Sequence, residues 1–387
     1  METDASTAKP GVLLLVVGAK GAVGSTVAAM VAGLRRDPET VLPWLTTSSA
    51  FPGLMADSEV VFSGWDTHEG SLVEALDQHG VLPASVWGVY EKFLSDARIL
   101  RPPCGSLESQ TAQLMSQLKE LSAAHPSCKP VVVNLLPAAP RPNWPKAGSL
   151  EELLRVSHGE APPDLAYACA AVRCGVPFVN FTSNEVEHPL LVEEARAGGV
   201  PLAGRDGKTG QTYLKVVLAS ALKARRLKVE GWYSLNILGN QDGRNLADPS
   251  RAEGKLVNKT QVLEEVLGYP VGDSPPGCAH TVHIAYYPPR GDAKEAWDVV
   301  DFKGLFGLPM SLRLNLLARD SVLAAPLVLD LARWMVGLQA IGRSGLVPEL
   351  GFYFKKPLGD APPRTFEEQL AALELLRGQC ANFGGCP

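Results

Sequence analysis

An apolar run that ends in a glycine-rich turn constrains the fold of this chain more than any other feature. Residues 11–17 (GVLLLVV) are continuously apolar, and the turn GAKGAVG leads into a helical pattern. Such a run is typical of a parallel strand buried on both faces. A glycine turn between strand and helix lets backbone N–H groups and the helix dipole face a pyrophosphate. The candidate cofactor-binding turn comprises Gly18, Ala19, Lys20, Gly21, Ala22, Val23 and Gly24.

The spacing of this turn leaves a second interpretation open. It reads GxxGxxG rather than GxGxxG, with Lys20 at the usual position of the second glycine. A tight turn with no ligand is therefore the alternative. No acidic residue lies at the end of a second strand about 20 residues further on, where the partner of a nucleotide ribose is usually found. Asp66, in the sequence GWD, is the substitute candidate, and its alternative is an exposed loop acid.

Strand and helix patterns alternate after the turn. Strands are predicted at residues 60–62, 130–136 and 176–180, and helices at 71–78, 84–95 and 164–174. This alternation predicts an α/β fold with an open parallel sheet covered by helices on both faces. Longer strands follow at 227–238, 280–287, 299–302 and 310–316, which indicates an antiparallel or mixed second sheet. Long helices are predicted at 320–342 and after residue 365.

The length of 387 residues is too great for one compact core. We therefore predict a first domain built from residues 11–213 and 326–387, with residues 214–325 inserted as a second domain.

Charge and cysteine content exclude several classes of protein. The net charge of −5 provides no positive field that would attract nucleic acid. Seven scattered cysteines form no CxxC pair, so we predict no metal site and expect the reduced thiols of a cytoplasmic protein. The apolar stretch 321–342 contains Asp330 and Arg333, which is typical of a core helix rather than a membrane span. Residues 1–10 lack the features of a signal peptide.

Two polar loops adjoin predicted elements. Residues 204–212 (GRDGKTGQT) precede a helical pattern, and amides at a helix start suit a phosphate or the cofactor's amide group. A helix capped by Thr209 is the alternative. In the second loop, SLNILGNQDGRNL at 234–246, Asn236 and Asn240 can orient sugar hydroxyls and Asp242 can assist proton transfer. An Asn/Gly turn is the alternative there.

Four lysines are candidates for an anion site. Lys255 and Lys259 would share one face of a helix, where their repulsion favours an anion between them. Lys294 and Lys355 are the other two candidates. The alternative for each is a solvated surface lysine.

The order and spacing of these segments resemble the myo-inositol-1-phosphate synthase family. The resemblance is carried by SLNILGNQDGRNL, KLVNK at 255–259, YYPPRGDAKEAWD at 286–298 and DSVLAAPLVLD at 320–330, with GVPFVN, AGRDGKTGQT and GWD upstream. It implies a Rossmann-type NAD-binding domain with an inserted α+β catalytic domain, built on a mixed sheet that joins subunits into a dimer or tetramer. It also implies that glucose 6-phosphate is oxidised at C5, enolised, cyclised onto its C1 aldehyde and reduced again with the same NAD.

The resemblance further implies roles for individual residues. Lys255 and Lys294 would polarise carbonyls and move protons, Lys259 would hold phosphate, and Lys355 would assist the redox step at C5. The remaining matching positions are Asp292, Asp320, Asn236, Asn240 and Asp242 around the substrate, and Asp66, Asn180, Asp206, Thr209 and Asp320 around the cofactor.

Three other functions remain open from the sequence. They are a related cyclase of another sugar phosphate, a simple NAD-dependent dehydrogenase that releases NADH, and a non-catalytic binding relative.

Overall fold

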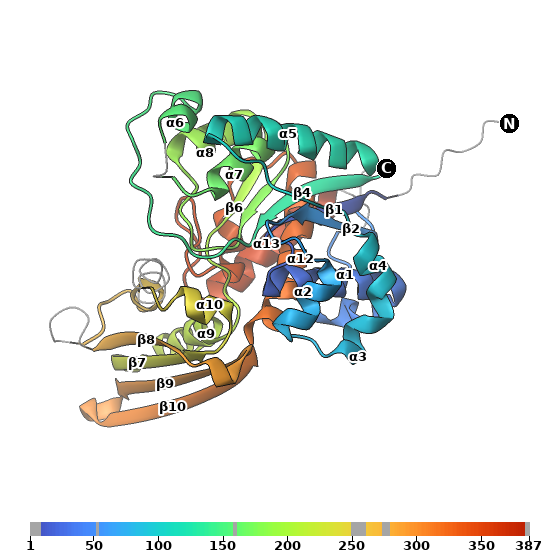
Figure 1. The fold of residues 1–387 in the computed structure, drawn as a ribbon. Helices are drawn as coiled ribbons and strands as arrows, with labels where there is room; N and C mark the ends of the chain where they lie inside the picture. Colours follow the sequence, from blue (N-terminus) through green and yellow to red (C-terminus); the bar gives the residue numbers. More distant parts are fainter. Residues whose placement is uncertain (1–8, 52–53, 158–160, 249–260, 273–278, 384–387) are drawn as a thin grey trace.

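Two separate sheets organise the chain (Figure 1). The structure is a computed structural model that describes residues 9–51, 54–157, 161–248, 261–272 and 279–383. The larger sheet is parallel and consists of β1 (Gly11–Val17), β2 (Val60–Trp65), β3 (Ile99–Leu100), β4 (Cys128–Asn134), β5 (Phe178–Asn180), β6 (Pro201–Gly204) and β11 (Gly345–Leu346). Its strand order, β11-β6-β5-β4-β1-β2-β3, contains the 3-2-1-4-5-6 order of dinucleotide-binding folds.

Helices cover both faces of the parallel sheet, as the alternating pattern predicted. The described helices are α1 (Ala22–Arg36), α2 (Leu72–His79), α3 (Ala84–Trp87), α4 (Glu91–Asp96), α5 (Leu107–Ala124), α6 (Leu150–Val156), α7 (Asp164–Arg173), α8 (Pro189–Ala197), α9 (Gln211–Ala224), α10 (Gln241–Asn245), α12 (Asp320–Ala340) and α13 (Phe366–Phe383). Alternate residues of β1 enter different cores: Val12 and Leu14 pack with α1 and α12, whereas Leu13 and Leu15 pack with α5 and α7.

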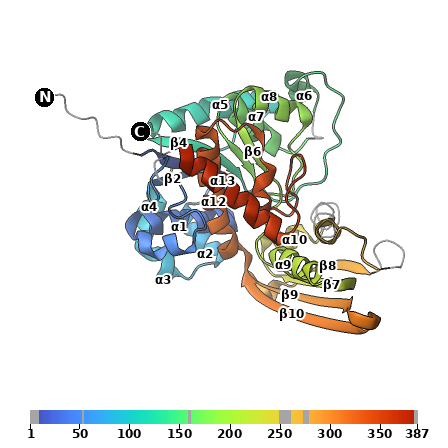
Figure 2. The same cartoon turned by 180° about the vertical axis from the view of Figure 1, so that it is seen from behind.

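The second sheet is mixed, which confirms the predicted two-sheet α/β fold. It consists of β7 (Lys228–Leu238), β8 (His280–Tyr286), β9 (Ala293–Lys303) and β10 (Pro309–Arg319). β7 pairs with β8 in parallel and with β9 antiparallel, and β10 forms the outer edge beside β9. One face of this sheet packs against α9 and a helical segment at 261–267. Seen from behind, α13 lies beside α12 on one side of the parallel sheet and runs towards α9 (Figure 2).

Helix α12 links the two sheets. It follows β10 directly and packs against α1 and against the strands β1, β4 and β6 of the parallel sheet. Among the described residues it is the one helix that is long and apolar enough to span a membrane, but most of that stretch is buried inside the protein. This burial fits the core helix predicted from Asp330 and Arg333, both fully buried.

Some details differ from the sequence predictions. The helix predicted at 84–95 is two short helices, since α3 ends at Trp87 and a 3-10 turn separates it from α4. The domain boundaries stay a prediction, and each of the two junctions lies inside a helix, α9 or α12.

Candidate functional site

The glycine turn has the backbone geometry of a phosphate-binding loop. Gly18 has φ +86°, in the left-handed region that favours glycine. A Cβ on Gly24 would lie 2.4 Å from the Gly18 carbonyl oxygen, so only glycine lets α1 approach β1 this closely. The first N–H groups of α1 have no acceptor within the helix. These residues therefore fit a pyrophosphate at the start of α1.

Asp66 lies beside this turn rather than in a remote loop. It directly follows β2, the parallel neighbour of β1, so it occupies the strand end where a ribose-binding acid is usually found. One carboxylate oxygen accepts the Lys20 backbone N–H at 2.7 Å, and the other accepts the His68 N–H at 2.8 Å. The long segment between α1 and β2 explains why sequence spacing alone did not place it.

A polar pocket lies where the two sheets meet. Its cavity is small, about 30 Å³. It is lined by Thr209, Gly210, Gln211, Thr212, Leu238, Asp242, Leu246, Ile284, Lys294, Asp320 and Lys355. Five of the predicted site residues therefore share this wall, together with the first turn of α9.

Two lysine–aspartate pairs lie at this pocket. Lys294 Nζ is 2.9 Å from Asp320 Oδ2, because β9 and β10 pair Lys294 with Ala318, two residues before α12 begins. Thr209 donates to the other oxygen of Asp320 at 3.2 Å.

The second pair, Lys355–Asp206, is held together by a backbone hydrogen bond between two loops. Lys355 Nζ is 2.6 Å from Asp206 Oδ1, and the Lys355 N–H donates to the Asp206 carbonyl at 2.7 Å. This short backbone pairing brings residues 149 positions apart into the same site.

Asp292 lies close to these pairs and is largely buried. Its Oδ1 accepts hydrogen bonds from Asn240 at 3.1 Å and Ser321 at 3.2 Å. Its Oδ2 is buried and accepts no hydrogen bond from the described residues. Burial, and to a smaller degree the charge of Asp320, raises the pKa of Asp292. This carboxyl group is therefore easier to protonate than an ordinary aspartate.

Of the remaining predicted substrate residues, two lie among the described residues and two do not. Asp242 lines the pocket, and Asn236 is fully buried on β7 with both amide atoms lacking partners among the described residues. Lys255 and Lys259 lie outside the described residues.

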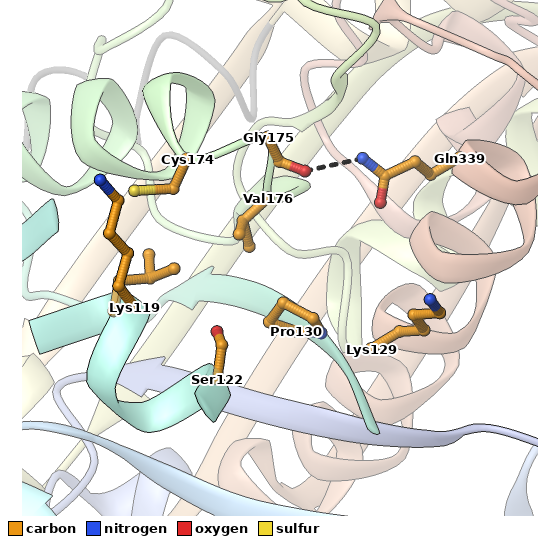
Figure 3. A pocket seen from close by; sticks show the side chains of 9 residues that line it. Lys119, Ser122, Lys129, Pro130, Cys174, Gly175, Val176 and Gln339 are labelled. Atoms are coloured by element: carbon orange, nitrogen blue, oxygen red, sulfur yellow. Dashed lines mark hydrogen bonds between the residues drawn. The ribbon is translucent and has the colours of Figure 1, made fainter. Parts of the chain in front are cut away.

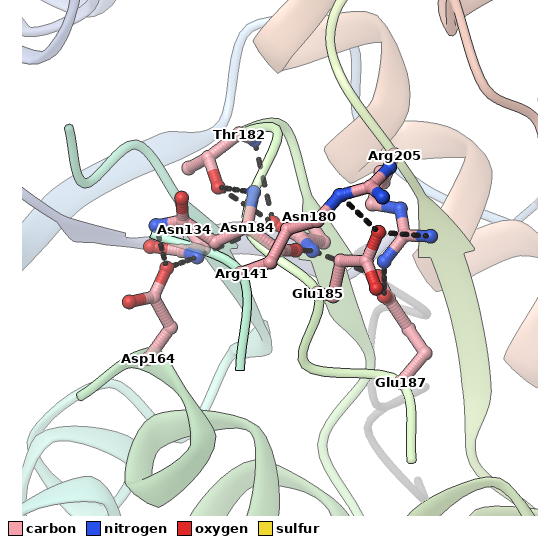
Figure 4. Close-up of polar contacts among 9 residues, drawn as sticks. All are labelled: Asn134, Arg141, Asp164, Asn180, Thr182, Asn184, Glu185, Glu187 and Arg205. Atoms are coloured by element: carbon pink, nitrogen blue, oxygen red, sulfur yellow. Dashed lines mark hydrogen bonds and ion pairs between the residues drawn. The ribbon is translucent and has the colours of Figure 1, made fainter. Parts of the chain in front are cut away.

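Asn180 belongs to a buried polar network at the carboxyl ends of β4 and β5 (Figure 4). Its amide donates to the Asn184 carbonyl at 2.7 Å and to Glu187 at 2.8 Å, and its oxygen accepts from Thr182. Its amide N–H groups are therefore used to hold the 180–187 loop. The predicted direct contact between Asn180 and the cofactor stays a prediction.

The same network contains charges that sequence reasoning missed. Asp164 accepts from Asn134 at 2.6 Å and from Asn184 at 2.7 Å, and burial raises its pKa. Arg205, next to Asp206, pairs with Glu187 at 3.3 Å and with Glu185 at 3.5 Å. This network stiffens the strand ends next to the glycine turn.

Lys208, in the polar loop 204–212, is another buried cation, and the sequence did not predict it as a site residue. Its ammonium donates to Gln369 Oε1 of α13 at 2.6 Å and to the Gly351 carbonyl at 3.2 Å. No carboxylate among the described residues forms an ion pair with it, and burial lowers the pKa of Lys208 to about 7. Lys208 thus attaches the loop carrying Asp206 and Thr209 to the C-terminal helix.

A larger groove lies at the opposite end of the parallel strands (Figure 3). It has a volume of about 390 Å³ and is lined by Leu118, Lys119, Ser122, Lys129, Pro130, Cys174, Gly175, Val176 and Gln339. Ligands of open α/β sheets bind at the carboxyl ends of the strands. We therefore place the candidate site at the smaller polar pocket.

The architecture and the site define the class of the protein. It is an α/β protein of the dinucleotide-binding type, in which Lys294 of a second, mixed sheet and Lys355 of a loop outside that sheet are each paired with an aspartate at a common pocket.

Comparison with known proteins identifies the family. The family model of myo-inositol-1-phosphate synthase matches residues 210–321. Inositol-3-phosphate synthase 1 of Bacteroides thetaiotaomicron is 33% identical over 359 residues, covering 85% of this chain and 82% of that protein. The human inositol-3-phosphate synthase 1 is 29% identical over 93% of this chain and 71% of its own length. The chain belongs to the inositol-3-phosphate synthase family and is an isomerase.

Solved structures agree on the fold. Inositol-3-phosphate synthase of Caenorhabditis elegans aligns with a TM-score of 0.83 at 20% identity, over 96% of this chain and 86% of that one. A myo-inositol-1-phosphate synthase-related protein of Thermotoga maritima aligns with a TM-score of 0.75 at 22% identity, over 96% and 98% of the two chains.

Proposed function

We propose that this protein converts D-glucose 6-phosphate into 1D-myo-inositol 3-phosphate with NAD as a bound cofactor. The observation that carries the proposal is the convergence of the pairs Lys294–Asp320 and Lys355–Asp206 on one pocket at the start of α9. Membership of the inositol-3-phosphate synthase family supports the same reaction.

The cofactor would be held by the glycine turn and by Asp66. Gly18 to Gly24 would receive the pyrophosphate, and Asp66 would face the adenosine ribose. When bound, NAD supplies the removal of a hydride from C5 of the substrate and its return. The protein provides binding, orientation and charge around that chemistry.

The substrate phosphate would bind at the first turn of α9. Gln211 and Thr212 begin this helix at the pocket wall, and their N–H groups have no intrahelical acceptor. A helix start suits a phosphate dianion. Lys259 would complete this phosphate site.

The lysines would stabilise the oxyanions of the reaction. Oxidation at C5 makes the protons on C6 acidic, and the enolate formed by their loss attacks C1, so negative charge moves from one oxygen to another. Lys294 and Lys255 would hold this charge, which is worth most in a site closed to water. Asp320 pairs with the ammonium of Lys294, and Asp206 pairs with that of Lys355, which would lie beside the redox carbon. Asp292, whose pKa is raised, would exchange a proton near Lys294.

Retention of an isotopic label tests this reaction. Substrate and product have the same oxidation level, so the hydride removed from C5 must return to that carbon. We expect glucose 6-phosphate with deuterium at C5 to give inositol phosphate that keeps the label, measured by mass spectrometry. Catalytic amounts of NAD should suffice, and NADH should not accumulate.

Other results would select among the alternative functions. One NADH per turnover with loss of the label would establish a simple dehydrogenase. Cyclisation of a different hexose phosphate, without turnover of glucose 6-phosphate, would establish a related cyclase. Binding of sugar phosphate without product would favour a non-catalytic relative.

We further propose that the mixed sheet joins subunits into a homo-oligomer. Tyr233 on β7 and Trp297 on β9 lie on the face away from α9 and are 46% and 47% exposed. Among the described residues β10 has no strand partner on its outer side, and Leu317 on this strand is exposed on the same face as Trp297. An apolar sheet face with a free edge is typical of an interface.

Replacing the exposed aromatic residues tests this interface. We expect Tyr233→Glu/Trp297→Glu to form a smaller species than the wild type, because burying two carboxylates at an apolar interface is costly. Light scattering coupled to size exclusion measures the mass. Trp44→Glu is the matched control, since Trp44 is 72% exposed on the other domain. A wild-type monomer at micromolar concentration would contradict the proposal.

A further inference from the structure

The contact between α9 and the mixed sheet is polar where an apolar contact would be expected. Gln211 begins α9, and Lys215 lies one turn further along the same face. Both side chains are buried against β7, β8 and β9. The apolar part of this contact, around Val216 and Ala219, lies further from the pocket.

Asp298 is the centre of this polar contact. It lies on β9 opposite Ser234 of β7 and is almost fully buried. Its Oδ1 accepts from the Trp232 indole at 2.8 Å and from the Ser234 hydroxyl at 2.5 Å. Its Oδ2 accepts from Gln211 Nε2 at 2.8 Å. One carboxylate therefore connects two strands of the mixed sheet to the first residue of α9.

Lys215 provides the compensating charge. Its ammonium donates to His280 Nε2 at 3.0 Å and lies 5.4 Å from the centre of the Trp232 ring. Burial, and the neighbouring charge of Lys215, lowers the pKa of His280 to about 3, so this imidazole is neutral and accepts the hydrogen bond.

This buried polar contact is not an efficient way to stabilise the fold. A buried carboxylate and ammonium lose their hydration, and apolar side chains of similar size hold two elements together at least as well. Directed hydrogen bonds instead define one position of a helix relative to its support. The position defined here is that of Gln211, whose side chain and helix start form part of the pocket wall.

We propose that Asp298 is a positioning residue for substrate binding. It fixes the amide of Gln211 and thereby the first turn of α9, where the phosphate of the substrate binds. This role rests on the proposed function, because the ligand of that turn is the phosphomonoester of a hexose phosphate. Asp298 itself is not among the residues that line the pocket.

Asp298→Asn tests the role with little change in shape. The Asn oxygen still accepts from Trp232 and Ser234, but its amide nitrogen faces the Gln211 Nε2, so the contact is kept only if the Gln211 amide turns over and exchanges the atoms that it presents to the pocket. We expect the KM for glucose 6-phosphate to rise about tenfold, the loss expected for one hydrogen bond to a charged group, while kcat changes less than about threefold. Calorimetric affinity for glucitol 6-phosphate, a hexitol phosphate with no aldehyde to cyclise, should fall by the same factor.

Two further variants separate positioning from stability. Ser234→Ala removes a hydrogen bond to the same carboxylate without touching Gln211, so its KM should stay within about twofold of the wild type at a similar loss of Tm. Gln211→Met breaks the Asp298 contact from the helix side and should raise KM as Asp298→Asn does. Gln211→Met also tests the positioning role if Asp298→Asn fails to fold.

The outcomes distinguish the two proposals. Wild-type affinity for glucitol 6-phosphate in folded Gln211→Met, or equal rises of KM in Ser234→Ala and Asp298→Asn, would overturn the positioning role alone. A wild-type protein that binds no hexitol phosphate would overturn the proposed function, and the positioning role with it.

Discussion

Lys294→Ala is expected to lower turnover of glucose 6-phosphate by about 10³-fold while leaving the protein folded. The ammonium of Lys294 is one of two described cations at the pocket, and its loss leaves Asp320 facing the site without this partner. An enolate formed next to this carboxylate in the absence of Lys294 is destabilised twice, by the loss of the cation and by the repulsion between the two negative charges. Product formation measures the turnover, and circular dichroism measures whether the variant is folded.

Lys303→Ala is the matched control. Lys303 lies on the same strand, β9, and also pairs with an acid, Glu230, but at the exposed far end of the strand. Exposed pairs of this kind contribute little to stability. Its turnover should equal that of the wild type. Wild-type turnover in Lys294→Ala would instead remove the lysine from the proposed chemistry.

Gly21→Asp is expected to weaken NAD binding by about 100-fold or more, because a carboxylate would face the pyrophosphate at close range. Gly21 caps the N-terminus of α1 with φ −67°, a conformation open to any residue. The backbone therefore tolerates the substitution, and the loss of NAD affinity measures the repulsion between the new carboxylate and the pyrophosphate. Fluorescence titration with NADH, or calorimetry with NAD, measures the affinity.

Gly21→Ala controls for the added side chain. A Cβ at this position meets only the Gly18 carbonyl oxygen, at 3.3 Å, so a small shift accommodates it. Its affinity for NAD should stay close to that of the wild type. Equal affinity in Gly21→Asp would show that the glycine turn does not hold the phosphates.

The strands and the glycine turn were predictable because their signal is local. The run at 11–17 is apolar on both faces, and it forms β1 in full. β9 was predicted to begin at Val299, although it begins at Ala293. Lys294, Glu295 and Asp298 interrupt the apolar pattern of this strand, because they serve the pocket, an ion pair with Arg290 and the contact to α9.

The candidate site was only partly predictable for a related reason. Both lysines, Lys294 and Lys355, and both aspartates could be named from motifs. Which lysine pairs with which aspartate depends on which backbone segments lie together. Asp298, Lys215 and Lys208 carry no sequence signal that separates them from surface charges. Their burial is a property of the packed elements alone.

The buried ammonium of Lys208 has a consequence for the proton balance of folding. In the unfolded chain a lysine keeps its proton up to about pH 10.4, whereas in the folded protein burial lowers this pKa to about 7. Between these two values the unfolded chain holds the additional proton, so unfolding takes up a proton from the buffer. The unfavourable charging of Lys208 is fully present below pH 7 and diminishes as the pH rises through this window. The contribution of Lys208 to the free energy of unfolding is therefore more favourable in mildly alkaline than in mildly acidic solution.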